Sequence, residues 1–345
     1  FVLSLAFLGF SHVDCVVALD LPVINSFIFI IYSLNPTFSF VREQYKYVSF
    51  TNKRDRVQFE NAPQTYLFSF SGRLNENMGA GLGLFQQNFG VFTTFGGIGN
   101  FAYNAVLNRY SNLTFGLNFG FYTSGINDAE VIADLGDPSL MNIPSNSLIF
   151  VNPGINFGTE FLDFGVSVNN LAVYNLTTSK IIEENPEQSI LAHTMYHGYF
   201  GRRGFFDESK FSALITAEIK EEETIFSGLM MVLVPRGIWA QLGYNTLYGA
   251  SGGLGINVTS QIAIEYNYER AIGSLDIFGS SHEVTVAYRF KNKNRYDYSG
   301  DDYEEGLFIN DKRKSPVKKR KTTATKKVEK EATVSYKHLR AHETF

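Results

Sequence analysis

The stretch LTFGLNFGF, residues 113–121, decides the fold class of this chain. Successive side chains of a β-strand point to opposite faces of the sheet. Every second residue here, from Leu113 to Phe121, is large and apolar, and the residues between them, from Thr114 to Gly120, are small or carry an amide. A soluble sheet usually places charged side chains on its solvent face. The pattern is instead typical of an outer-membrane barrel strand, with an apolar lipid face and a small or polar interior face.

The same alternation returns along the chain. In FLDFGVSVN, residues 161–169, and in QIAIEYNYE, residues 261–269, apolar side chains alternate with small or polar ones. The polar face of the second stretch carries Glu265 and Glu269 and would be costly to turn toward lipid. We therefore predict an all-β protein, an antiparallel outer-membrane β-barrel of about fourteen strands. The strands are expected near residues 44–51, 64–73, 79–87, 97–107, 112–122, 148–157, 161–169, 190–200, 209–219, 224–234, 237–246, 250–258, 261–270 and 281–290.

Composition supports this class. Aromatic residues make up 15% of the 345 residues, glycine is plentiful at 30, and only 19% of residues are charged, which favours strands, turns and interfacial aromatic girdles. The chain has no uninterrupted apolar run of about 18 residues, so a bundle of membrane helices is excluded. The single cysteine, Cys15, excludes an internal disulfide and a cysteine-rich metal site.

The connections between the predicted strands alternate in length. Those after even-numbered strands are all short, whereas the odd-numbered ones include 52–63, 88–96, 123–147 and 170–189. Outer-membrane barrels have short periplasmic turns and longer outer loops. The alternation therefore predicts that both chain ends lie in the periplasm, and that the loop 123–147 is long enough to be a functional cap.

The chain before the barrel divides into two parts. The apolar run VLSLAFLGFS, residues 2–11, has the length of a signal-peptide core and is too short to span a membrane. We expect residues 1–15 to be a signal peptide whose start is truncated, since the first residue is Phe1. Residues 16–43 are either an N-terminal lead-in or a plug segment tucked inside the barrel mouth, and residues 44–290 form the barrel.

The barrel is expected to end at Phe290. The last strand, SHEVTVAYRF, has an apolar face of Val284, Val286, Tyr288 and Phe290. A terminal strand that closes on an aromatic residue resembles the signal that barrel-assembly machinery reads in outer-membrane proteins. These four residues are therefore the predicted barrel-terminal site.

Residues 291–345 differ in charge from the rest. They carry 15 of the 30 Lys and Arg against 9 acidic residues, so this part is +6 and the remainder, 15 minus 25, is −10. Neither its acidic nor its basic stretch has a repeating apolar face, which predicts a disordered charged tail. A periplasmic partner suits the tail better than nucleic acid, and a simply solvated tail without a partner is favoured over both. The last residues, SYKHLRAHETF, resemble translated adapter sequence and are excluded from fold reasoning.

No pattern in the chain indicates catalysis, a cofactor or a metal. His193 and His197, four apart on one strand, would lie about 13 Å apart, too far for one metal ion. The glycine clusters GAGLGLF and GASGGLGIN lack a phosphate-binding lysine or a dinucleotide fingerprint, so we interpret them as small residues on an inward face. We predict that the protein is not an enzyme.

Four stretches together resemble the PorP/SprF family of type IX secretion system membrane proteins from Bacteroidota. They are LNPTFSF at 34–40, NPGINFG at 152–158, GVSVNNL at 165–171 and SHEVTVAYRF at 281–290. The resemblance runs from about Leu34 to Phe290. The first stretch departs from the family's NPAYAG-like element, because Thr37 and Phe38 follow the Asn-Pro pair.

The resemblance implies a non-catalytic outer-membrane component of type IX secretion. Such a protein assists the export or surface attachment of cargo with C-terminal secretion domains, including gliding-motility adhesins and secreted enzymes. Its implied partners are the secreted cargo, periplasmic ring and motor components, and outer-membrane lipid. The alternative is an outer-membrane channel or transporter for small hydrophobic solutes, since a fourteen-stranded barrel with an apolar segment inside would suit that role.

Overall fold

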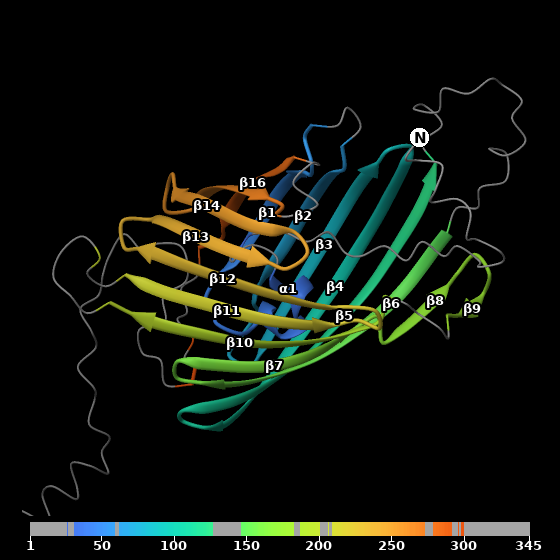
Figure 1. Ribbon diagram of the computed structural model, residues 1–345. Coiled ribbons are helices and arrows are strands. Elements are labelled where there is room, and N and C mark those ends of the chain that lie inside the picture. Colours follow the sequence, from blue (N-terminus) through green and yellow to red (C-terminus); the bar gives the residue numbers. More distant parts are fainter. Residues whose placement is uncertain are drawn as a thin grey trace, which may run out of the picture. The chain divides into compact units, whose positions relative to one another are not determined.

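The computed structural model describes most of the predicted barrel. The described residues are 26, 31–58, 62–126, 146–182, 187–200, 206, 209–272, 279–291, 296, 298 and 299. Within them, sixteen strands form one antiparallel sheet, of which β8 and β9 are a side hairpin (Figure 1). The other fourteen close into a ring through the pairings of β1 with β16 and of β5 with β6. The predicted fold class and strand number are confirmed.

The barrel strands follow one another as antiparallel neighbours in chain order. Their bounds are β1 (Lys46–Arg54), β2 (Gln64–Arg73), β3 (Met78–Phe89), β4 (Phe92–Asn108), β5 (Ser111–Ile126), β6 (Asn146–Thr159), β7 (Leu162–Asn169), β10 (Ser189–Tyr199), β11 (Lys210–Ile219), β12 (Thr224–Val234), β13 (Ile238–Asn245), β14 (Gly249–Asn257), β15 (Ile262–Arg270) and β16 (Ser280–Arg289).

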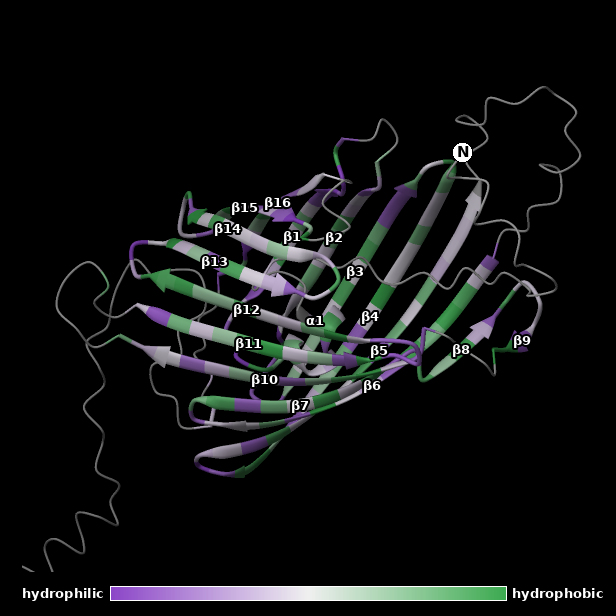
Figure 2. Cartoon of the chain, viewed as in Figure 1, coloured by the Kyte–Doolittle hydropathy of each residue, from purple (hydrophilic) through white to green (hydrophobic). Residues whose placement is uncertain are grey.

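The two faces of the strands are those that the alternation predicts. On β5, Leu117 and Phe119 are about half exposed on the outer face, whereas Asn118 between them is fully buried. Figure 2 shows the resulting bands of hydrophobic and hydrophilic residues along the strands. On β16, Val284 and Val286 likewise point outward. The outer face therefore suits lipid and the inner face is polar.

The turn between β3 and β4 differs from the prediction. Residues 88–96 were expected to be a loop, but β3 continues to Phe89 and β4 begins at Phe92. Gly90 takes a φ of 56°, which only glycine adopts at little cost, and this allows a two-residue turn. The run of aromatic and threonine residues beyond it is strand, so the expected long loop is wrong.

The predicted loop 170–189 contains a small hairpin. Its strands are β8 (Ala172–Asn175) and β9 (Lys180–Ile181). β6 pairs with β7 through Gly154–Gly158 and with β8 through Leu148–Val151. The two halves of β6 therefore have different neighbouring strands on this side. Strands of two and four residues are too short for a periodic signal. Of the predicted loop 123–147, residues 127–145 lie outside the described part.

The described residues just before β1, 32–42, lie inside the ring of strands. This part of the chain contains α1 (Ile31–Leu34) and the 3₁₀ helix η1 (Pro36–Ser39), and α1 is seen within the barrel in Figure 1. Within the described residues, no helix has both the length and the apolar character needed to cross a membrane. The predicted signal peptide, 1–15, lies outside these residues.

The first described residues after β16 pack against the barrel and are not part of a free tail. Tyr296, Tyr298 and Ser299 are all buried, and they contact the barrel interior. Residues 300–345, which hold the basic run, lie outside the described part.

Candidate functional site

The chain from Tyr32 to Arg42, here called the interior segment, owes its shape to the Asn-Pro-Thr sequence. The Asn35 side-chain oxygen accepts hydrogen bonds from the Thr37 backbone N–H at 3.0 Å and from Thr37 Oγ1 at 2.8 Å. Pro36 stands at the first position of η1, where a missing N–H costs nothing. The LNPTFSF stretch thus encodes a capped helical turn.

Inward glycines of the barrel wall make room for this turn. A Cβ added at Gly79 on β3 would lie 2.6 Å from the Ser39 carbonyl oxygen. At Gly116 on β5 it would lie 2.5 Å from the Thr37 nitrogen. Real Cβ atoms do not come so close to backbone atoms, so any larger residue here would displace the segment.

Two further glycines receive side chains of the segment. A Cβ at Gly83 on β3 would lie 2.7 Å from the Tyr32 hydroxyl, and one at Gly154 on β6 would lie 2.8 Å from Asn35 Oδ1. Burial raises the pKa of the Tyr32 phenol above its ordinary value, so the side chain stays neutral. The predicted inward face of GAGLGLF is therefore a bed for the interior segment.

Amide side chains of the wall bind the segment's exposed carbonyls. Asn100 on β4 donates to the Pro36 carbonyl at 2.8 Å and to Asn118 Oδ1 at 2.6 Å. Asn118 on β5 donates to the Tyr32 carbonyl at 2.9 Å. These bonds satisfy backbone acceptors that a short helix leaves free. All four residues are buried.

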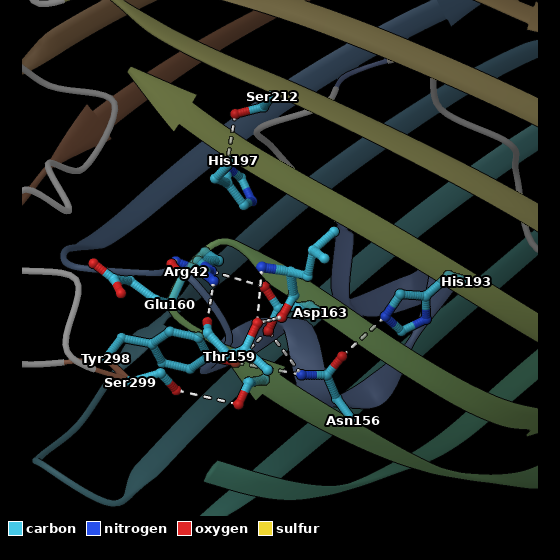
Figure 3. A network of polar contacts seen from close by, with 12 residues as sticks. Arg42, Asn156, Thr159, Glu160, Asp163, His193, His197, Ser212, Tyr298 and Ser299 are labelled. Carbon is cyan, nitrogen blue, oxygen red and sulfur yellow. Dashed lines mark hydrogen bonds and ion pairs between the residues drawn. The ribbon is translucent and has the colours of Figure 1, made fainter. Parts of the chain in front are cut away.

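The segment ends at a buried ion pair, shown in Figure 3. Arg42 Nε donates to Asp163 Oδ2 on β7 at 2.7 Å, and both side chains are almost fully buried. The two terminal nitrogens of Arg42 donate to the carbonyls of Glu160 at 2.9 Å and Thr159 at 2.6 Å. Tyr298, from the far end of the chain, donates its hydroxyl to Asp163 Oδ1 at 2.6 Å. Asp163 therefore joins both ends of the chain to β7.

Asp163 is also linked to the N-cap of η1. Asn156 on β6 donates to Asp163 Oδ1 at 3.1 Å, and its own Oδ1 lies 3.1 Å from His193 Nε2. His193 Nδ1 lies 3.3 Å from the Asn35 amide nitrogen. One neutral tautomer, protonated on Nε2, satisfies both contacts. A continuous chain of hydrogen bonds thus runs from Asn35 to Asp163 and Tyr298.

The two histidines on β10 have separate partners. Both are buried in the interior, as their spacing on one strand predicts. His193 belongs to the chain of bonds above, whereas His197 Nδ1 lies 2.7 Å from Ser212 Oγ on β11.

The residues after β16 pack beside the interior segment. Gln44 and the backbone of Tyr296 exchange two hydrogen bonds, at 2.9 and 3.1 Å. The Arg73 guanidinium lies 3.8 Å from the ring centre of Phe40, and 5.3 and 5.7 Å from those of Tyr296 and Tyr298. One stacked cation therefore holds rings from both ends of the chain.

A second polar cluster lies on the opposite wall. Trp239 Nε1 donates to Glu265 on β15 at 2.7 Å, and Gln241 donates to Asn267 at 2.5 Å. Ser26 also hydrogen-bonds Glu265. Inward Gly255 on β14 leaves room for the Trp239 ring, which a Cβ would overlap.

Sequence reasoning did not single out Arg42, Asp163 or Tyr298. One signal was present: an acidic residue on the inner face of a barrel strand needs a cation or several donors close by. Asp163 carries that signal, but Arg42 lies 121 residues before it and Tyr298 lies 135 residues after it. Of the predicted terminal residues, Val284, Val286 and Tyr288 lie outward on β16, and Phe290 follows it, also outward.

These features define an outer-membrane β-barrel whose interior holds residues from before its first strand and from after its last strand. The profile of type IX secretion system membrane proteins PorP/SprF matches residues 16–288, so the chain belongs to the PorP/SprF family. No curated protein matches the chain.

Solved outer-membrane proteins resemble the fold at low identity. Omp33 of Acinetobacter baumannii is 11% identical over 72% of this chain and 99% of its own, with a TM-score of 0.44. The monoaromatic hydrocarbon channel CymD is 10% identical over 79% and 96%, with a TM-score of 0.45. The P. putida toluene transporter TodX is 9% identical over 74% and 91%, with a TM-score of 0.36.

Proposed function

We propose that this protein is a non-catalytic outer-membrane component of type IX secretion that assists export or surface attachment of cargo proteins with C-terminal secretion domains. Gliding adhesins and secreted enzymes are the expected cargo, and periplasmic ring and motor components the expected further partners. Membership of the family across residues 16–288, which include nearly the whole barrel and the interior segment, carries the proposal. Both chain ends are expected on the periplasmic side, where the short turns lie.

The long-loop end of the barrel is the proposed cargo surface. Its β8–β9 hairpin presents Leu171, Tyr174 and Ile181 as exposed apolar side chains. Exposed apolar groups on a hairpin outside the ring suit contact with another protein. The lumen suits cargo less well, because the interior segment fills space along β2 to β7 with buried contacts.

The rival function, a channel for small hydrophobic solutes, requires a path through that lumen. The interior segment lies in that lumen in either case, and membership of the PorP/SprF family is what favours secretion over this rival. A channel becomes the better account if the purified barrel passes such solutes and carries no partner.

The test is affinity isolation of the tagged barrel from outer membranes in mild detergent. The matched variants replace the β8–β9 hairpin, residues 172–181, by a short glycine-serine turn, or replace Glu221–Glu223, a charged tip on the same end of the barrel. We expect the full chain and the tip variant to bring down a large exported protein, and the hairpin variant to lose it. Recovery of the barrel alone from all three, at levels that exclude simple loss of partners, would contradict the proposal.

A further inference from the structure

A residue before the first strand and a residue after the last strand meet on one buried carboxylate. Asp163 takes the Arg42 Nε at 2.7 Å from the N-terminal side and the Tyr298 hydroxyl at 2.6 Å from the C-terminal side. The Arg42 guanidinium also lies 4.6 Å from the centre of the Tyr298 ring. Ser299 Oγ donates to the Gly158 carbonyl at 3.4 Å. The end of the interior segment therefore depends on residues more than 250 positions later in the chain.

The chain before Arg42 contacts opposite walls of the barrel. Asn35 faces Gly154 on β6, and Ser26 hydrogen-bonds Glu265 on β15. β6 and β15 are seven strands apart in either direction around the fourteen-strand ring. Ser26 and Asn35 thus contact opposite sides of the barrel.

The barrel does not need this segment to close. Within the described residues, the strand pairings run from β1 to β16 and back to β1 without any strand from the segment. The backbone–backbone hydrogen bonds of residues 35–43 are local ones, such as Phe40 N–H to the Thr37 carbonyl at 3.0 Å. The wall holds the segment through side chains, so the segment can leave while the ring of strands stays intact.

We infer that the interior segment, Tyr32–Arg42, is a releasable plug of the lumen and that Tyr296, Tyr298 and Ser299 form the latch that keeps it seated. The hydrogen-bond chain from Asn35 through His193 and Asn156 to Asp163 couples the body of the plug to the latch. Drawing Tyr298 away from Asp163 removes its hydrogen bond to that carboxylate and its ring from Arg42, and this loosens the plug. The inference stands independently of the cargo proposed above.

The test combines conductance with chemical labelling on the full-length chain in a Cys15→Ser background. Planar-bilayer recordings measure opening, and reaction of Ser39→Cys with a membrane-impermeant maleimide reports whether the plug is seated, since Ser39 is fully buried. The variants are truncation after Phe290, Tyr298→Ala, and Gly116→Val, which fills the seat of the plug. Gly99→Val, an outward glycine on neighbouring β4 with no close contact nearer than 3.8 Å, is the control.

We expect the full chain and Gly99→Val to stay closed and unlabelled. Truncation, Tyr298→Ala and Gly116→Val should each raise open time and labelling at least tenfold. Heat-dependent migration on gels identifies folded barrels, and Tyr298→Phe replaces any latch variant that fails to fold. Steady conductance by the unmodified chain would contradict the inference that the interior segment plugs the lumen. Opening by Gly116→Val, but not by truncation or by a folded latch variant, would contradict the inference that the latch keeps the plug seated.

Discussion

Replacing Asp163 by asparagine tests the energy of the network that ties the chain ends together. Asparagine keeps an oxygen that can accept from Tyr298 and nearly the same volume, but it removes the counter-charge of Arg42. Breaking a buried ion pair from one side typically costs about 3 to 5 kcal/mol. Arg42 keeps its bonds to the carbonyls of Thr159 and Glu160, so we expect about 3 kcal/mol, roughly a hundredfold in the unfolding equilibrium.

The assay is denaturant unfolding in micelles, followed by the fluorescence of Trp239. It is the single tryptophan of the chain and is fully buried, so it reports loss of the barrel. The matched control is Asp55→Asn, which removes a partly exposed carboxylate 3.2 Å from Lys53 and leaves Glu269 at 3.9 Å. A partly exposed pair is worth less than about 1 kcal/mol. Equal losses from the two substitutions would refute the assignment of Asp163 as the anchor.

Three further predictions concern other parts of the barrel. Trp239→Phe should lower the free energy of unfolding by about 1 to 2 kcal/mol, because Glu265 loses a donor in the interior. The shift of the heat-dependent gel transition measures this loss. No shift would mean that water replaces the indole. Lys53→Met should cost about 3 kcal/mol by removing the buried cation 3.9 Å from Glu269, and a second substitution, Glu269→Gln, should restore most of the lost denaturant midpoint. Phe290→Ala should reduce the amount of barrel assembled in the outer membrane without lowering the melting point of what assembles, whereas Phe290→Tyr should assemble normally.

The sequence was sufficient for the wall of the barrel because lipid imposes one requirement on every strand. Each outward position must be apolar and each inward position may be polar, so even short strands such as β13 and β15 repeat the same period of two. The 88–96 stretch was wrongly predicted as a loop, because β3 continues to Phe89 and β4 begins at Phe92. The strands β8 and β9 are too short to show a periodic pattern.

The interior site was predictable only in part, because its partners are far apart in sequence. Asp163 stands on an inward face, which signals a need for donors, but nothing near it in sequence names Arg42 or Tyr298. The tyrosines at 296 and 298 lie in a stretch whose charge predicts a free tail. Their burial depends on one acceptor, Asp163, and one stacked cation, Arg73. Such contacts produce no periodic pattern in the sequence.

The inward glycines of the barrel wall mark the places where other groups approach it closely. A barrel wall needs small inward residues wherever large inward side chains or other backbone approach it, and Gly253 and Gly255 serve the first need beside Asn267 and Trp239. Gly79 and Gly116 serve the second, because the atoms nearest to them belong to backbone of the interior segment. An inward glycine stripe together with an Asn-Pro-Thr turn before the first strand therefore predicts a chain segment seated against the wall. The same argument explains why a methyl group added at Gly116 should act on the plug, while one added at outward Gly99 should act on nothing but lipid.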